Sequence, residues 1–403
     1  MTQHRDRGGP LAGVRVLAIC KVWAGPYAAK MLSLLGAEVI KIESMGALDE
    51  MRAYGGVDIE HAPYFISQNT EILSARVNLK SDEGLGLLRK LIAKSDIVID
   101  NLRPGALEKL GLAYADMKAL KRDIIHVSIK MYGNEGPLGY QTGYAPSFAA
   151  IGGLNYLVGH EGRVPKGMNI RYGDTTAGAA AAFGAIAALH HREATGEGQF
   201  VDLSAVETIS SLLGDSLLAC SLTGESPQHH GNYSPDLAPH GANPCADDGW
   251  ISIACDGNDE WRTLVRELGA PDIATDARFA THKMRLENRD ALDRTISALT
   301  CLQDAVALAD ALRAAGIAAY PSASSLALIS EDSFWSRNAF RMVENGNGDM
   351  RPVVGAPWRM DPDEADITHG APTLGQHDDY VYRELLGLDE DAMNALIERK
   401  AIS

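Results

Sequence analysis

The alternation of short β-branched segments with helical patterns constrains the fold of this 403-residue chain more than any other feature. Residues 14–20 (VRVLAIC) predict a strand, residues 27–37 a helix and residues 38–43 (EVIKIE) a second strand. The alternation continues with a strand at 75–80, a helix at 82–93 with Ser81 as N-cap, a strand at 96–101, a helix at 113–120 and a strand at 123–129. This order predicts an α/β fold with a parallel, doubly wound sheet and a ligand crevice at the carboxyl ends of its strands.

The first turn between strand and helix argues against a dinucleotide cofactor. Residues 21–27 read K-V-W-A-G-P-Y and contain no G-x-G-x-x-G fingerprint. The fold is therefore expected to be Rossmann-like, without a nicotinamide or flavin cofactor.

The rest of the chain divides into less regular parts. Residues 133–180 are rich in Gly, Pro and Tyr and predict long loops, and a helix of small residues then runs to about residue 194. Because Asp174 begins this helix and His190, His191 and Arg192 end it, we expect a buried core helix rather than a membrane span. Residues 225–245 predict a connector, residues 240–330 a smaller α/β domain, the stretch after Phe334 a loop, and residues 389–402 an amphipathic helix.

Charge and cysteine usage exclude several classes of function. The net charge of −16 repels phosphate backbones and anionic lipids, so neither a nucleic acid nor a membrane is expected as a partner. Five widely spaced cysteines without a C-x-x-C pair indicate neither a disulfide framework nor a zinc site. Met1 to Pro10 lack the apolar region of a signal peptide. We expect a soluble, cytoplasmic protein without a metal.

Asp174, which follows a glycine at the start of the small-residue helix, is the sharpest candidate for chemistry. It can be an N-cap, because Asp is a preferred capping residue and the helix dipole stabilises its charge. It can also be a nucleophile, because carboxylates form covalent intermediates that divide one difficult transfer into two easier steps. Backbone N–H groups nearby would then stabilise an oxyanion.

Five segments in the same order resemble the class III coenzyme A transferases, of the formyl-CoA, carnitine and benzylsuccinate type, and the related α-methylacyl-CoA racemases. They are PLAGVRVL (10–17), residues 24–43, NLRPGALEKLGL (101–112), residues 173–207, and GQHDDYVYRELLGL (375–388). The resemblance implies a Rossmann-like large domain built from both chain ends, a small inserted domain and two interlocked chains. The expected boundaries are 1–215 for the first part of the large domain, 216–240 for a linker, 241–325 for the small α/β domain, and 326–403 for the return linker and the rest of the large domain.

The resemblance places the catalytic aspartate of the family on Asp174. It implies attack on an acyl-CoA thioester, a mixed anhydride with free CoA thiolate, an aspartyl-CoA thioester and release of a new acyl-CoA, without a metal or redox cofactor. The residues that it places around CoA and the acyl group are Val22, Trp23, Ala24, Val77, Lys80, Asn101, Leu102, Arg103, Lys109 and Tyr144. Trp23, where formyl-CoA enzymes often carry glutamine, is equally compatible with a core-facing turn. Arg103 and Lys109 are either solvated charges or phosphate ligands.

Tyr144 favours transfer over racemisation. The resemblance places a histidine base of the racemases at this position, and tyrosine, with a pKa near ~10, is a poor base at neutral pH. His126 lies in an apolar strand, where we expect a buried, hydrogen-bonded histidine. We therefore predict a CoA-transferase acting from succinyl-CoA on a free acid, of which an aryl- or alkyl-succinate, mesaconate or another dicarboxylate are candidates. The alternatives are an α-methylacyl-CoA racemase and one subunit of a hetero-oligomeric transferase, so the partner chain is either identical or homologous.

Overall fold

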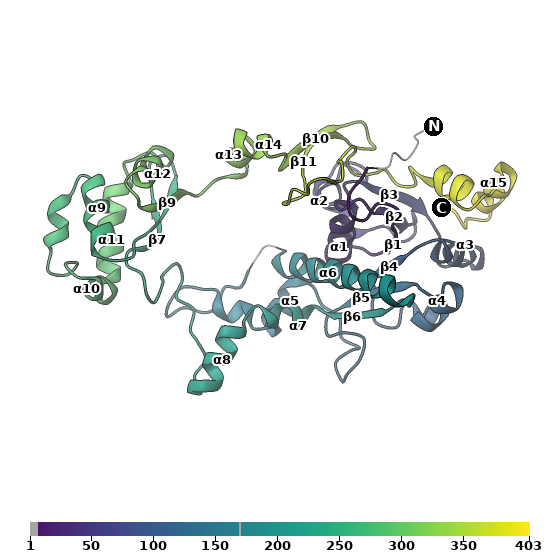
Figure 1. Cartoon of the computed structure of the whole chain (residues 1–403), viewed down its shortest axis with the longest axis horizontal. Coiled ribbons are helices and arrows are strands. Elements are labelled where there is room, and N and C mark those ends of the chain that lie inside the picture. The colour runs from purple at the N-terminus through teal and green to yellow at the C-terminus, as the bar shows by residue number, and fades with distance from the viewer. Residues whose placement is uncertain (1–6, 169–170) are drawn as a thin grey trace. The chain divides into compact units, whose positions relative to one another are not determined.

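The chain forms two compact units (Figure 1). The computed structural model describes residues 7–168 and 171–403. Residues 1–6, in the expected N-terminal segment, and 169–170, in the expected loop at 133–180, lie outside the described residues. Unit 1 takes its described residues from 1–154, 168–222 and 332–403, and unit 2 from 155–167 and 223–331. Both ends of the chain thus contribute to unit 1, and residues 155–167 belong to unit 2.

The centre of unit 1 is a six-stranded sheet in which all neighbouring strands run parallel, which confirms the predicted α/β class. Its strands are β1 (Arg15–Ile19), β2 (Glu38–Glu43), β3 (Ile72–Arg76), β4 (Ile97–Asp100), β5 (Ile125–Lys130) and β6 (Phe200–Ser204). The spatial order is β3-β2-β1-β4-β5-β6. The chain therefore builds outward from β1 in one direction and then from β4 in the other, and the switch point between them is where such sheets bind ligands.

Helices cover both faces of this sheet. The helices of unit 1 are α1 (Ala24–Ser33), α2 (Pro63–Gln68), α3 (Asp82–Ala93), α4 (Tyr114–Leu120), α5 (Ala145–Ile151), α6 (Tyr172–Thr195), α7 (Ala205–Ser211), α8 (Gly214–Thr223, ending at the border of unit 2), α14 (Asp332–Ser336) and α15 (Glu390–Glu398). Ser81 caps α3 as predicted, because its side chain accepts a hydrogen bond from the Gly84 N–H. By length and composition, no single helix of the described chain could cross a membrane, although α7 with α8 and one pair in unit 2 pass that test as bent pairs.

Two hydrophobic cores lie on opposite faces of the sheet. Alternate residues of a strand point to opposite faces, so Val16 and Ala18 of β1 pack with α1 and α6, whereas Leu17 and Ile19 pack with α3 and α4. The second core also contains Tyr382, Ala401 and Ile402, and partly buried residues of α15 pack against it. The C-terminal part of the chain is therefore a structural layer of unit 1.

Helix α6 packs directly against α1, and a glycine permits the close approach. A Cβ atom on Gly178 of α6 would lie 2.6 Å from the carbonyl oxygen of Ala24, the first residue of α1, and 3.1 Å from the Tyr27 Cβ. Buried alanines of α6 continue this contact along its length. Helix α6 thus packs one face into the core, as the sequence predicted, while Phe183 on another face is exposed. The N-terminal half of α6 lies beside the start of α1.

Three sequence predictions were wrong in position or type. The strand expected at 75–80 lies at Ile72–Arg76. It ends early because the Asn78 N–H donates to the Ala401 carbonyl at 2.9 Å, outside the sheet, and the Asn78 side chain accepts from the Lys80 N–H. The loops expected at 133–180 contain α5. The stretch after Phe334 contains a hairpin of β10 (Phe340–Glu344) and β11 (Met350–Val354), for which the Gly-Asn run at 345–348 supplies the turn.

Unit 2 has a separate core around an antiparallel sheet in the order β7-β8-β9. Its strands and helices are β7 (His240–Pro244), β8 (Trp250–Ala254), β9 (Ala318–Pro321), α9 (Asn258–Glu267), α10 (His282–Glu287), α11 (Arg289–Thr300), α12 (Ala305–Ala314) and α13 (Ser325–Ile329). Arg285 is fully buried and donates to the carbonyl oxygens of Ala238 and Gly257, at 2.8 Å each. These bonds join the start of the sheet to the helices that cover it.

We predict that Gly178→Ala destabilises the fold by about 1–3 kcal/mol, because the new methyl group must displace the α1 backbone. Gly86→Ala is the matched control, since Gly86 lies inside α3 and a Cβ added there would meet nothing within 4 Å. Alanine there should stabilise the helix by about 0.5–1 kcal/mol. Urea unfolding followed by circular dichroism measures both, and equal effects of the two changes would contradict the packing argument.

Candidate active site at the start of α6

The loop between β1 and α1 is fixed by side chains from neighbouring segments. Asn101, directly after β4, accepts a hydrogen bond from the Lys21 N–H at 2.9 Å and donates to the Lys21 carbonyl at 2.7 Å. Asp49 accepts from the Val22 N–H at 2.8 Å. Because β1 and β4 are neighbours on either side of the switch point, the Asn101 bonds join the two strand ends at which a ligand is expected.

Val22 has a backbone conformation that its side chain disfavours. Its φ is 67°, which is rare for a β-branched residue and costs on the order of 1–3 kcal/mol. The partner of its N–H, Asp49, is itself held by the buried Lys41 ammonium at 2.8 Å, and Lys41 also donates to the Cys20 carbonyl at 2.9 Å. A buried ion pair beneath the loop therefore holds the strained turn in place.

Asp174 is the third residue of α6, and the N-cap interpretation is wrong. The N-cap position belongs to Arg171, and no side chain caps the helix. Among the described residues, no group donates a hydrogen bond to the Asp174 carboxylate. Burial raises the pKa of Asp174 to about 6, and the positive charge of Arg171 opposes part of that rise. Asp174 is thus a half-buried carboxylate that is mainly ionised at neutral pH and engaged by no fixed partner.

Trp23 lies beside Asp174 and holds the first turn of α6. Its indole Nε1 donates to the Thr175 Oγ1 at 3.2 Å, and that hydroxyl donates to the Arg171 carbonyl at 2.9 Å. The Arg171 guanidinium lies 4.6 Å from the centre of the Trp23 ring and 4.1 Å from the centre of the Tyr64 ring of α2. Trp23 is half-buried, and its indole contacts Thr175, the residue after Asp174, and Arg171.

Helix α5 brings Tyr144 toward the same region. Tyr144 is the N-cap of α5, and the carbonyl of the next residue, Ala145, lies 3.3 Å from the position of a Cβ on Gly173. The Phe148 ring is closer still, at 2.8 Å from that position. Gly173 therefore allows α5 to pack against the residue before Asp174, while the Tyr144 side chain stays largely exposed.

The other residues expected around CoA lie in the segments that follow β3 and β4 and differ in exposure. Lys80, Arg103 and Lys109 are exposed, and Leu102 packs partly against the core below the sheet. Val77 is buried, and its N–H donates to the Glu43 carbonyl at 2.7 Å, so its side chain is part of the core.

A buried polar network supports the loop after β4. His126 is 4% exposed and its Nε2 lies 2.9 Å from Asp100 Oδ2, which confirms the prediction of a buried, hydrogen-bonded histidine. The Lys130 ammonium also bonds to Asp100, whose carboxylate accepts from the Leu102 N–H at 3.1 Å. These charges hold the pKa of Asp100 below its ordinary value against the effect of burial.

Sequence reasoning missed Arg171, Tyr64 and Thr175. Thr175 and the residues around Asp174 stand in the motif that was singled out, yet nothing local indicated that a tryptophan from residue 23 would bond to it. Arg171 precedes the Tyr-Gly-Asp triplet by one position, and only the folded chain brings it between two aromatic rings from distant segments. A cation next to the candidate nucleophile was the one signal in the sequence that could have drawn attention to it.

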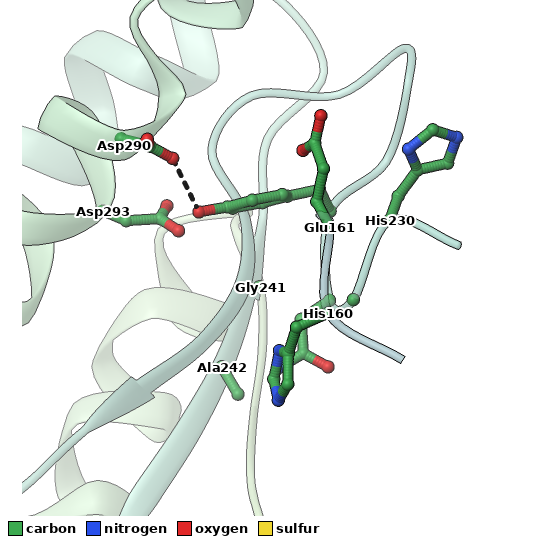
Figure 2. A pocket seen from close by; sticks show the side chains of 10 residues that line it. His160, Glu161, His230, Gly241, Ala242, Asp290 and Asp293 are labelled. Carbon is green, nitrogen blue, oxygen red and sulfur yellow. Dashed lines mark hydrogen bonds between the residues drawn. The ribbon is translucent and has the colours of Figure 1, made fainter. Parts of the chain in front are cut away.

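Unit 2 contains a cavity of about 340 Å³ that holds none of the predicted site residues (Figure 2). Its lining includes Glu161, Asp290, Asp293 and His230, and the Tyr233 hydroxyl donates to Asp290 at 3.1 Å. Within residues 7–168 and 171–403, no group of three or more His, Cys, Asp or Glu side chains is placed to hold a metal ion. Three carboxylates, Glu161, Asp290 and Asp293, make this cavity acidic.

Comparisons with known proteins agree over the length of the chain. Residues 11–378 match the family model described as CoA-transferase family III. A succinyl-CoA–D-citramalate CoA-transferase from Chloroflexus aurantiacus is 32% identical over 98% of this chain and 98% of its own length. The alpha subunit of a succinyl-CoA–L-malate CoA-transferase from the same organism is 31% identical, covering 98% of this chain and 92% of that protein. The crystal structure of a CAIB/BAIF family protein from Brucella suis superposes with a TM-score of 0.88 at 30% identity, covering 94% of this chain and all of that one.

We predict that Asp174→Asn stabilises the folded protein at neutral pH. The folded pKa of about 6 lies above the ordinary value of 3.8, so the ionised carboxylate disfavours folding above pH 6, by up to about 2–3 kcal/mol. The gain from asparagine should shrink as the pH falls through 6 and vanish below about 3.8. Urea-unfolding midpoints between pH 4.5 and 8 measure this dependence.

Asp82→Asn is the control for that experiment, because Asp82 is an exposed residue in the first turn of α3. Loss of its favourable interaction with the helix dipole should lower stability slightly at neutral pH, which is the opposite sign. A neutral or destabilising effect of Asp174→Asn at pH 8 would show that its carboxylate is not desolvated.

Proposed function

The chain belongs to CoA-transferase family III, and we propose that it moves coenzyme A from an acyl-CoA, with succinyl-CoA the first donor to test, to a free carboxylic acid through Asp174. The observation that carries this proposal is the state of Asp174. Its carboxylate is half-buried, ionised at neutral pH and without a hydrogen-bond donor among the described residues. A carboxylate whose lone pairs are free and partly desolvated is a competent nucleophile.

The reaction balances without any further reagent. The Asp174 carboxylate attacks the thioester carbonyl and expels the CoA thiolate, which leaves a mixed anhydride. The thiolate then attacks the Asp174 carbonyl and releases the donor acid, leaving an aspartyl-CoA thioester. The acceptor carboxylate attacks this thioester, and return of the thiolate to the acceptor's acyl carbon releases the new acyl-CoA and restores Asp174.

The position of Asp174 suits the charge that develops in these steps. Each attack places negative charge on a carbonyl oxygen beside the first turn of a 24-residue helix, whose dipole is positive at this end. The first N–H groups of a helix lack partners within the helix and can donate to such an oxygen. The strained turn at Val22 and Trp23 is held by hydrogen bonds and contacts the first turn of α6. The backbone around Asp174 therefore needs little reorganisation during the reaction.

Three cations are proposed to bind the phosphates of CoA. Lys80, Arg103 and Lys109 follow the ends of β3 and β4, on the side of the sheet that carries the switch point. No acceptor or carboxylate among the described residues engages their charged groups. Free cations at strand ends are what a phosphate ligand requires on a protein with a net charge of −16.

A second chain of the same family is proposed to complete the assembly as an interlocked dimer. Unit 1 exposes large apolar side chains on α6 and α8, with Phe183 at 75% and Leu222 at 77% exposure. Exposed apolar groups of this size are typical of protein interfaces. The relatives include single-chain transferases and enzymes of unlike alpha and beta subunits, so the second chain is either a copy or a homologue.

Asp174→Asn should lower the rate of CoA exchange between succinyl-CoA and dicarboxylic acids by at least about 10³-fold, because the amide is a poor nucleophile. Incubation of the native protein with acyl-CoA and hydroxylamine should modify Asp174, as mass spectrometry of the peptide would show. Full exchange activity in the asparagine variant would sink the proposal. If the native enzyme instead exchanges the α-proton of an acyl-CoA with deuterated water and moves no CoA between acids, it is a racemase.

Arg103→Ala should raise the KM for acyl-CoA about tenfold with little change in kcat, because a charged hydrogen bond to a phosphate far from the reacting carbon is lost. The matched control is Arg122→Ala. Arg122 is 82% exposed and pairs only loosely with Glu197, so its loss should leave KM unchanged. Steady-state kinetics at constant ionic strength measures the KM of both variants. If the KM of Arg103→Ala equals that of the Arg122→Ala control, Arg103 is not part of the CoA site.

A further inference from the structure

The Arg171 guanidinium contacts two aromatic side chains that meet at an angle. Its central carbon lies 4.6 Å from the centre of the Trp23 ring and 4.1 Å from that of the Tyr64 ring, and the two rings meet edge to face at 6.2 Å. Contact with aromatic rings fixes the guanidinium plane and leaves its N–H edge as the available binding surface. The backbone beside it is fixed too, because the Arg171 carbonyl accepts from both the Thr175 N–H and the Thr175 hydroxyl.

The hydrogen-bonding edge of this guanidinium is unoccupied by the described residues. No carbonyl, hydroxyl or carboxylate among them accepts a hydrogen bond from it or pairs with it within 4.0 Å. Asp174, three residues along α6, senses the charge of Arg171 without forming an ion pair with it. Half-buried arginines ordinarily have an acceptor, so an oriented fork of five N–H donors without one is suited to bind a ligand carboxylate with two hydrogen bonds.

We propose that Arg171 binds the remote carboxylate of a dicarboxylic acyl group and so selects succinyl-type thioesters and dicarboxylic acceptors. The inference rests on the proposed transfer reaction at Asp174 and names the residue that selects the substrate by its second carboxylate. The orientation follows from the two fixed points: Asp174 takes the reacting carbonyl carbon, and the far end of the acyl chain reaches the guanidinium.

The reacting carboxylate is the weaker candidate for this contact. In the second half of the reaction the acceptor carboxylate must attack with its own lone pairs, and a bidentate guanidinium would occupy those lone pairs. Such binding stabilises the ground state and is lost as the new bond forms, which opposes catalysis. A carboxylate at the other end of the molecule keeps both hydrogen bonds through every intermediate.

The test compares succinyl-CoA with butyryl-CoA, which has the same number of acyl carbons and a methyl group in place of the carboxylate. Release of CoA thiol in the presence of hydroxylamine, one equivalent per site because Asp174 is modified, reports the first half of the reaction and needs no known acceptor. The full-length native protein should react about 100-fold faster or more with succinyl-CoA than with butyryl-CoA, in the second-order rate constant of this release. Arg171→Met keeps the unbranched apolar stem and removes the guanidinium. At pH 8.5, well above the pKa of about 6 that Asp174 has beside the Arg171 charge, this variant should lose about 100-fold with succinyl-CoA and less than threefold with butyryl-CoA. Arg171→Lys should recover part of the loss, since it keeps the charge but not the fork.

Two controls separate this role from a structural one. Arg278→Met removes another arginine that stacks on an aromatic ring, that of Phe279 in unit 2, and should leave the rate of thiol release from both thioesters unchanged. Thiol release from butyryl-CoA by Arg171→Met reports whether the site of this variant is still folded. An equal loss with both thioesters, or a native protein that does not distinguish them, overturns the assignment of Arg171 while CoA transfer stands. A native protein that releases CoA from neither thioester overturns the proposed function and this inference together.

Discussion

The contact between α6 and α1 is the constraint on which the site depends. Asp174 has no hydrogen bond from the described residues to hold it, so its position follows from that of its helix, and Gly178 one turn later allows that helix to touch the α1 backbone at Ala24. The same residue, Ala24, follows Trp23, whose indole bonds to Thr175. Packing between two helices therefore sets the distance between the candidate nucleophile and the strand ends. A fixed scaffold with an unengaged carboxylate is the arrangement that nucleophilic catalysis requires.

The polar groups beneath the site perform a different task from those inside it. Asn101 and Asp49 accept hydrogen bonds from the backbone N–H groups of residues 21 and 22. The Asp100 carboxylate contacts the side chains of His126 and Lys130. Asp49, Asp100 and Lys130 are buried and engaged by neighbouring groups, so they hold loops in place. Asp174 and Arg171 have no such partners among the described residues, and this contrast distinguishes groups that support the site from groups available to a substrate.

Local patterns predicted the elements whose contacts are local. β1, α1 and β2 lie within a few residues of their expected positions, and Ser81 caps α3, because periodicity and capping depend on neighbours in sequence. The end of β3 was misplaced because its limit is set by Ala401, more than 300 residues away. Asp174 was singled out by its motif. The contact of the Arg171 guanidinium with the rings of Trp23 and Tyr64 could not be predicted, because only the fold brings these three residues together. Sequence thus indicated the proposed nucleophile but not the residue proposed to bind the far carboxylate of the substrate.

The net charge of −16 bears on how a substrate that is anionic at both ends can be held. The long-range field of the protein repels such a molecule, so binding must come from short-range contacts with cations that lack internal partners. The proposed site has such cations in two places, with Lys80, Arg103 and Lys109 for the phosphates and Arg171 for the acyl carboxylate. Because Arg171 is partly desolvated between two rings, its interaction is less screened by salt than those of the exposed group. Affinity for CoA should therefore weaken as ionic strength rises, while the preference for a dicarboxylic acyl group persists.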